Sequence, residues 1–425
     1  MSNTSATKAQ NKGSYVLSIS IIGALFFIFG FVTWLNGILI PYLKIACELT
    51  NFQALFVAFA FYISYTVMAL PSSWVLKKTG FKNGMMVGLL VIALGTLLFV
   101  PAAKTRTYEL FLLGLFVMGT GLAILQTASN PYITIVGPRE TAARRISIMG
   151  ICNKVAGTLA PLILAYFILN DGDAFVVNLA KLDGIARVAA LDELASRVIN
   201  PYMVMTGVLV LLAIMIRYSP LPEVESEPEN EQDEAVAGKT SIFQFPHLIL
   251  GATALFFYVG AEVIAGDTII RYGIAQGFAI NSAKVFTSLT LIAMIVGYVL
   301  GIVLIPKVVS QRRALEISAI LGILFSLVAI FSTPTISITA VALLGLANAL
   351  VWPAIWPLAI HDLGRFIKTG SALLIMAIAG GAILPLLWGY LSDIIGLQNA
   401  YWILIPCYAI VLLFATRWYK LRSWR

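Results

Sequence analysis

Three ionisable side chains stand inside segments that are otherwise apolar, namely Lys154, Glu262 and Asp267. Burying a charge among apolar groups is costly, so each of these residues needs a partner or a chemical role. Glu262 and Asp267 are five positions apart, about 140° around an ideal helix. They share a face only if the helix loosens, at Gly260 or Gly266. We therefore expect these residues to hold an ion pair or a cation, and the pattern leaves open which acid pairs with Lys154.

Uncharged polar residues recur at helical spacing in other apolar segments. Side chains four positions apart share a helix face. Amides both donate to and accept from hydroxyl groups, and an aromatic ring packs on the apolar face of a sugar, so this combination suits a sugar. The alternative is that these groups join helices to one another, as polar residues do in membranes. The predicted sugar-binding set is Asn36, Gln126, Asn130, Asn153, Glu262, Asn348, Trp352 and Trp356.

A second predicted set would couple a cation to transport, and it consists of Asp267, Glu262, Lys154 and Thr33. A proton route would use one of the two acids, sensed through Lys154. A sodium ion near Asp267 would need several oxygen ligands, which Thr33 and nearby amides could help to supply. Asp267 could instead pair with Arg271, one helical turn along. The sequence does not decide between sodium and proton.

The composition requires lipid around these segments. Hydrophobic residues make up 60% of the 425 residues and charged residues only 11%, with a mean hydropathy of +0.93. A water-soluble domain of this size needs far more charge on its surface. One crossing of a bilayer takes roughly 20 apolar residues. We predict an all-α protein with twelve transmembrane helices, at 17–41, 52–76, 84–103, 109–136, 146–169, 199–216, 247–271, 284–306, 315–332, 336–358, 370–392 and 398–416.

The positive charges fix the predicted orientation. Nineteen of the 28 lysines and arginines fall on one side of this arrangement, which the positive-inside rule places in the cytoplasm with both termini. The basic balance is thus a topology signal, and nucleic acid is excluded as a partner. The first helix has no small-residue cleavage site after it, so we expect it to be retained. Three scattered cysteines imply neither a disulfide framework nor a metal site.

The chain is divided by an acidic, proline-containing segment at 217–245 that cannot bury enough apolar surface to order itself. The residues on its two sides resemble each other: Leu25-Phe26-Phe27 recurs at an offset of 230 as Leu255-Phe256-Phe257. We predict two pseudo-symmetric six-helix bundles, 1–216 and 246–425, joined by a cytoplasmic linker at 217–245.

The chain lacks the residue patterns that common enzyme mechanisms need. His247 and His361 stand at predicted helix ends. The chain has no zinc-binding His-Glu-x-x-His, no nucleophile elbow and no phosphate-binding glycine loop. We therefore expect no catalysis and no cofactor, only a coupling ion.

Three motifs resemble the fucose permease and glucose/galactose permease branch of the major facilitator superfamily, and the likeness extends over nearly the whole chain. The fourth-helix motif is the most specific. The motifs are Leu49-Thr50-Asn51-Phe52-Gln53, Gln126-Thr127-Ala128-Ser129-Asn130-Pro131-Tyr132 and Gly260-Ala261-Glu262.

The resemblance implies the major facilitator fold and uptake of a monosaccharide together with a cation. In fucose permeases an Asp on the first helix and a Glu on the fourth are taken to carry proton coupling and substrate binding. The matching positions here are Gly37 and Gln126, so this chain departs from that mechanism and from fucose as its substrate. The glucose/galactose permeases of the branch include sodium-driven members.

The sequence thus predicts a secondary active symporter that moves a monosaccharide such as glucose or galactose with Na⁺ or H⁺ by alternating access. We expect a monomer in a bacterial inner membrane. Three alternatives stay open: an uncoupled sugar facilitator, a sugar sensor that does not transport, and a transporter of another small organic solute. The identity of the sugar is not predicted.

Overall fold

The computed structural model describes residues 3–135, 142–219, 221, 239–305, 308–363 and 366–424. Within these ranges the side chains of residues 3–15 and of a few residues near the gaps, Asn130 among them, are outside the description. The predicted linker at 217–245 lies largely outside the described residues.

The first half consists of helices. They are α1 (Asn3–Trp34), α2 (Asn36–Ala46), α3 (Asn51–Ala54), α4 (Phe56–Thr105), α5 (Tyr108–Ile135), α6 (Ala142–Ile168), α7 (Gly172–Leu179), α8 (Gly184–Ser196) and α9 (Ile199–Tyr218).

The second half is also helical. Its α-helices are α10 (Pro246–Asp267), α11 (Ile269–Ala275), α12 (Ile280–Ala283), α13 (Phe286–Leu304), α14 (Gln311–Phe331), α15 (Pro334–Asn348), α16 (Val351–Ile360), α17 (Ile367–Met376), α18 (Gly380–Ile395) and α19 (Leu404–Thr416). Short 3₁₀ turns lie at Ile242–Gln244, Ala377–Ala379, Asn399–Ile403 and Trp418–Lys420.

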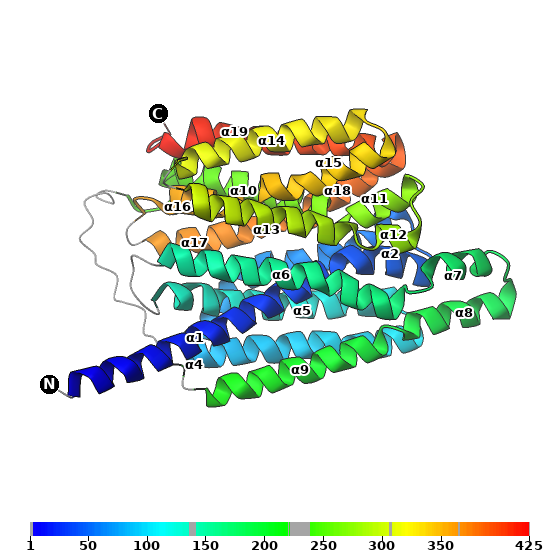
Figure 1. Cartoon of the computed structure of the whole chain (residues 1–425), viewed down its shortest axis with the longest axis horizontal. Helices are drawn as coiled ribbons and strands as arrows, with labels where there is room; N and C mark the ends of the chain where they lie inside the picture. Colours follow the sequence, from blue (N-terminus) through cyan, green and yellow to red (C-terminus); the bar gives the residue numbers. More distant parts are fainter. Residues whose placement is uncertain are drawn as a thin grey trace.

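The described residues contain twelve helical segments long and apolar enough to cross a membrane, which confirms the predicted number. The first segment, Val16–Ala46, runs past the predicted end at residue 41 because α2 continues the line of α1 beyond a one-residue break. The sequence did not predict α7 and α8, a helical hairpin that projects from one end of the bundle (Figure 1).

Local sequence explains where several helices begin and turn. Thr50 accepts a bond from the Gln53 backbone N–H (3.1 Å), and the Gln53 side chain accepts one from the Thr50 N–H (2.9 Å). This reciprocal pair is a capping box, which satisfies the first donors of α3. Pro246 and Pro334 stand at the starts of α10 and α15, where a missing N–H costs nothing. Gly80 adopts φ 74°, which turns α4 into two successive spans.

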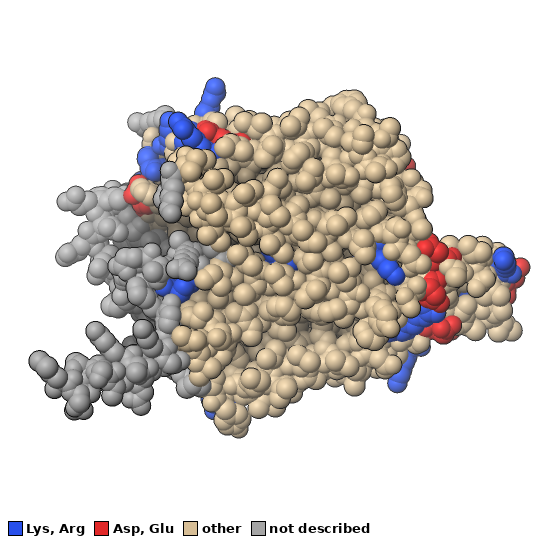
Figure 2. All heavy atoms as spheres, in the orientation of Figure 1, with Lys and Arg blue, Asp and Glu red and all other residues tan. Residues whose placement is uncertain are grey.

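Charged residues gather at the two ends of the bundle. The band between them shows almost no blue or red on this face (Figure 2). We call the end at which α9 ends and α10 begins the linker end, and the end that carries α7 and α8 the hairpin end. An uncharged band between two polar ends is what a bilayer requires.

Glycines set equivalent helix contacts in the two halves. A Cβ on Gly30 of α1 would lie 1.7 Å from the Asn153 carbonyl oxygen of α6. A Cβ on Gly260 of α10 would lie 2.2 Å from the Leu384 side chain of α18. Small residues let membrane helices approach closely. Gly30 and Gly260 are related by the offset of 230, so the sequence repeat corresponds to equivalent packing of α1 on α6 and of α10 on α18.

Candidate functional site

The central feature of the site is a buried ion pair between the two halves. Lys154 Nζ of α6 lies 2.9 Å from Glu262 Oε1 of α10. The two side chains are 10% and 13% exposed. Both residues lie within membrane-spanning segments, where a single charge is costly and a pair is tolerated. The sequence left open which acid pairs with Lys154, and in the structure that acid is Glu262.

Trp34 completes this centre, although the predicted sets did not include it. Lys154 Nζ lies 4.5 Å from the Trp34 ring centroid, a cation–π distance. The indole fits between two glycines, since a Cβ on Gly157 of α6 or on Gly266 of α10 would lie 2.3 Å from its ring atoms. Trp34 thus contacts both halves and fixes the position of the lysine. Its place beside Thr33 and Asn36 in the sequence was the signal that could have identified it.

A second polar group lies in the first half. Gln126 Nε2 of α5 donates to the Tyr65 hydroxyl of α4 at 3.0 Å, and Thr33 lies beside the same hydroxyl. Gln126 and Thr33 therefore contact the same side chain, Tyr65, which the sequence did not identify. Asn153 Nδ2 bonds the Phe26 carbonyl of α1 at 3.4 Å, a contact that joins helices. Asn130 is on α5, but its side chain lies outside the described residues.

Asn348, Trp352 and Trp356 are spaced by four positions in the tenth span, but a break between α15 and α16 separates Asn348 from the two tryptophans. Trp352 and Trp356 of α16 stack with centroids 5.4 Å apart, and both are part-exposed. Asn348, on α15, is fully buried and its Oδ1 accepts a bond from the Tyr408 hydroxyl at 3.0 Å. The two tryptophans can offer an apolar face to a ligand, while the Asn348 carbonyl is occupied within the second half.

Asp267 lies near the Lys154–Glu262 ion pair, but in the part of the chain that the structure describes it is Glu262, and not Asp267, that pairs with Lys154. The Asp267 side chain is fully buried, and its carboxylate interacts with the Tyr62 phenol of α4. The Asn36 amide is also buried, and it interacts with the same phenol. The two side chains lie beside the Tyr62 phenol of α4. The structure therefore places Asn36 and Asp267 beside the same tyrosine.

Arg271 turns away from Asp267, so the alternative pairing of these two residues does not occur. Its Nη1 donates to the Asn51 carbonyl at 2.7 Å and its Nη2 to the Ser392 hydroxyl at 3.3 Å. The guanidinium carbon lies 4.6 Å from the Trp388 ring centroid. Because Asn51 belongs to the first half and Arg271 to the second, this contact closes the bundle on the hairpin side of Asp267.

Further contacts close the same end. The Asp173 carboxylate of α7 accepts bonds from the Ile280 and Asn281 backbone N–H groups at the start of α12, at 2.7 and 3.0 Å. The Ser288 hydroxyl donates to the Thr158 carbonyl at 2.7 Å. Each of these bonds joins the first half to the second.

Exposed ion pairs hold the hairpin to the bundle. Arg187 Nη2 lies 2.8 Å from Glu48 Oε1 and so joins α8 to the segment after α2. Arg197 binds both Asp171 and Glu193 and so joins the two ends of the hairpin to each other. The hydrogen bond from Arg197 holds the pKa of the Asp171 carboxyl below its usual value.

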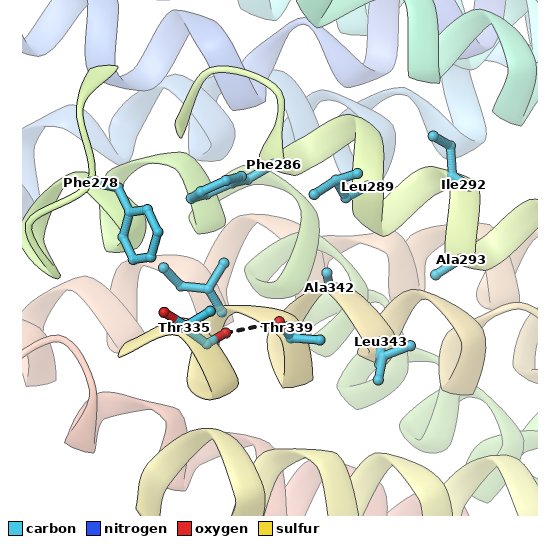
Figure 3. Close-up of a pocket in the computed structure, with 10 residues that line it drawn as sticks. Phe278, Phe286, Leu289, Ile292, Ala293, Thr335, Thr339, Ala342 and Leu343 are labelled. Atoms are coloured by element: carbon cyan, nitrogen blue, oxygen red, sulfur yellow. Dashed lines mark hydrogen bonds between the residues drawn. The ribbon is translucent and has the colours of Figure 1, made fainter. Parts of the chain in front are cut away.

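An apolar pocket of about 350 Å³ lies between α13 and α15, away from these polar residues (Figure 3). Phe278 and Phe286 line one end, and the Thr339 hydroxyl donates to the Thr335 carbonyl within α15 at 2.8 Å. Leu289 is 45% exposed on the membrane-facing surface. The pocket offers a sugar few hydrogen-bond partners and is not the candidate site.

Comparison with known proteins agrees with this architecture. The family model of the Major Facilitator Superfamily matches residues 22–379. A glucose/galactose transporter of Brucella abortus biovar 1 (strain 9-941) is 34% identical over 95% of this chain and 95% of its own length. An L-fucose-proton symporter of Escherichia coli (strain K12) is 30% identical over 96% of this chain and 94% of its own.

A solved structure shows the same arrangement. A Major Facilitator Superfamily transporter crystallised in the outward conformation superimposes with a TM-score of 0.73 at 28% identity, covering 97% of this chain and 100% of its own. With twelve spans in two halves and a family match over most of its length, this chain is a multi-pass membrane transporter that belongs to the Major Facilitator Superfamily.

Proposed function

We propose that this chain is a cation-coupled symporter of a monosaccharide, with glucose and galactose as the first substrates to test. The observation that carries the proposal is the Lys154–Glu262 pair beside Trp34, buried where the two halves meet. Relatives named as a glucose/galactose transporter and an L-fucose-proton symporter support the substrate class.

The pair can bind a sugar because both of its groups hydrogen-bond to hydroxyls. The Glu262 carboxylate accepts two or more bonds and the Lys154 ammonium donates up to three, so a sugar can share both groups. The Trp34 ring, or the stacked Trp352 and Trp356, can cover the apolar face of the sugar. The Gln126–Tyr65 pair in the first half offers further donors and acceptors.

Alternating access follows from the position of the pair. Lys154 belongs to the first half and Glu262 to the second, so a sugar held by both residues is bound by both halves at once. Opening the hairpin end requires the Arg271–Asn51 and Asp173–α12 bonds to break. Rocking of the halves about a fixed site is the usual motion of such repeats.

We also propose the orientation. The linker end lies in the cytoplasm with both termini, and the hairpin end lies outside, in the inner membrane of a bacterium. The excess of positive charge in the short loops of the linker end supports this orientation. We propose that the monomer is the transporting unit, since both halves of the site come from one chain.

The test is uptake of radiolabelled glucose and galactose into proteoliposomes, with inward sodium and proton gradients imposed separately. Symport predicts accumulation above equilibrium with one of the two gradients, and empty liposomes give the background. Equilibration without accumulation under both gradients would leave an uncoupled facilitator. Failure of every hexose to enter or to protect the protein from thermal unfolding would favour another solute.

A further inference from the structure

The pocket between α13 and α15 opens toward lipid. Its volume of about 350 Å³ is at the lower end of the range of about 300–1,000 Å³ that ligand pockets occupy. Leu289, Ile292 and Leu343 line it and are 45%, 46% and 37% exposed on the membrane-facing surface. A molecule that enters this pocket therefore comes from the bilayer.

The walls of the pocket are held in place from behind. α13 and α15 touch at Gly345, where a Cβ would lie 2.0 Å from the Thr290 carbonyl oxygen, and this contact closes the gap between the two spans on the interior side. The inner face of α13 is bound to the first half, because the Ser288 hydroxyl donates to the Thr158 carbonyl at 2.7 Å. Walls fixed in this way do not collapse onto the space between them, and an unfilled space loses dispersion contacts.

The lining suits a hydrocarbon chain. Phe278 and Phe286 close one end with ring centroids 5.6 Å apart, and aliphatic side chains of α13 and α15 line the rest (Figure 3). The small side chain of Ala342 leaves room between the spans, and the Thr339 hydroxyl is already bonded to the Thr335 carbonyl at 2.8 Å. A polar solute would leave its own groups unpaired here, whereas an acyl chain needs no hydrogen bond.

Apolar contact alone does not select one lipid. A chain that leaves the bilayer for the pocket exchanges one apolar environment for another, so selectivity needs a polar contact at the mouth. Residues 272–306 and 317–360 include every residue of the lining and contain one charged side chain, Lys284. Lys284 comes two positions before Phe286, at the closed end of the pocket.

Lys284 has donors available for an anion. Its Nζ donates to the Asn281 side-chain oxygen at 2.9 Å, and no acid lies within ion-pair distance of it in the part of the chain that the structure describes. Asp173 of α7 accepts its bonds from the backbone N–H groups of Ile280 and Asn281. An ammonium has three donors, so two remain. Lys284 also lies near the start of the span Ile280–Leu304, where lysine side chains reach lipid headgroups.

We propose that this pocket binds one anionic phospholipid, with an acyl chain between α13 and α15 and the phosphate on Lys284. The lipid belongs to the leaflet at the hairpin end. Its site is separate from the Lys154–Glu262 pair, and the proposal does not depend on which solute the chain transports.

The test counts lipids bound to the purified full-length protein by native mass spectrometry, with palmitoyl-oleoyl phosphatidylglycerol or phosphatidylcholine added to the detergent. The two lipids have the same chains and differ in net charge. The wild type should retain one phosphatidylglycerol about fivefold more tightly than phosphatidylcholine, the contribution of one lysine near a bilayer surface. Lys284→Gln should abolish this preference. Lys104→Gln, an exposed lysine at the hairpin end of α4, is the matched control and should keep it.

A second set of variants fills the pocket without changing a charge. Ala342→Phe should weaken retention of both lipids at least tenfold, and Ala293→Phe does the same if the first variant does not fold. Val299→Phe, on the exposed face of α13 outside the lining, is the control and should retain lipid as the wild type does.

Three results would overturn the proposal. Equal retention of the two lipids by the wild type would mean that the pocket holds any lipid or detergent chain. A preference that survives Lys284→Gln would place the phosphate elsewhere. Normal retention of phosphatidylglycerol by the filled variants would show that no chain occupies the pocket.

Discussion

The centre of the bundle and its hairpin end both contain ion pairs, but the pairs differ in their exposure to solvent and therefore in their contribution to stability. At the centre, Lys154 and Glu262 are 10% and 13% exposed. At the hairpin end, Arg187 and Glu48 are 39% and 50% exposed at a similar distance of 2.8 Å. An exposed pair contributes about 0–1 kcal/mol, whereas breaking a buried pair costs about 3–5 kcal/mol. Burial, rather than distance, decides which pair the protein depends on.

The largest effect is expected for Glu262→Gln. The change leaves the Lys154 ammonium buried without its counter-charge and removes an acceptor for sugar hydroxyls. Sugar affinity should fall about 100-fold or more, as measured by binding of labelled sugar to the purified protein. Glu193→Gln, in an exposed pair on α8, is the control and should bind normally. An unchanged sugar affinity in Glu262→Gln would show that this residue has only a structural role.

A smaller effect is expected for Gly157→Ala, which tests the centre without changing a charge. The new Cβ would lie 2.3 Å from the Trp34 ring and would push the indole away from Lys154. Overpacking of this kind costs about 1–3 kcal/mol, so sugar affinity should fall about tenfold in the same binding assay. Gly207→Ala on α9 is the matched control, because a Cβ there meets nothing within 4 Å. Equal affinities in the two variants would contradict the role given to Trp34.

Arg271→Gln tests the closure of the hairpin end. Losing the charged bond to the Asn51 carbonyl should favour opening by about 1.5–3 kcal/mol. The reporter is Cys47, a part-buried cysteine that follows α2. Burial raises the pKa of its thiol to about 11, so its labelling by maleimide is slow near pH 7.5 and quickens as pH rises. Labelling of Cys47, resolved by mass spectrometry, should become several-fold faster in the variant. An unchanged rate would show that Arg271 does not hold this end closed.

The smallest effect is expected for Asp171→Asn, in the exposed pair with Arg197. The folded-state pKa of Asp171 is lowered, so the carboxylate adds stability above its unfolded value near pH 3.9, and this contribution is lost as pH falls through the folded value. The melting temperature of the variant should lie slightly below that of the wild type at pH 7. The difference should shrink below about pH 4. A large difference at pH 7 would contradict the low weight of exposed pairs.

The sequence predicted the elements of the fold well because lipid imposes one simple rule on every span. The twelve segments and their approximate ends followed from apolar length alone. The α7–α8 hairpin was not predicted, because charged residues interrupt its sequence. The structure joins α8 to α9 in one apolar helical segment, Gly184–Tyr218, which begins well before the predicted start at residue 199.

The candidate site could be predicted only in part. Lys154, Glu262 and Asp267 were identifiable because charges in apolar segments are rare. Their partners were not, because a side chain's neighbours across helices depend on rotation and tilt. Trp34 and Tyr65 looked like ordinary membrane aromatics until the structure placed them against Lys154 and Gln126.

The tight packing around Gly37 limits the order in which this site could have evolved. Any side chain at this position would collide with Thr287, whose hydroxyl bonds the Gly266 carbonyl. An acid at position 37 therefore requires a second change, because Thr287 would first have to become smaller and give up that bond. Position 37 and position 287 are thus expected to change together, and a lineage that keeps this threonine is expected to keep its buried acids on α10.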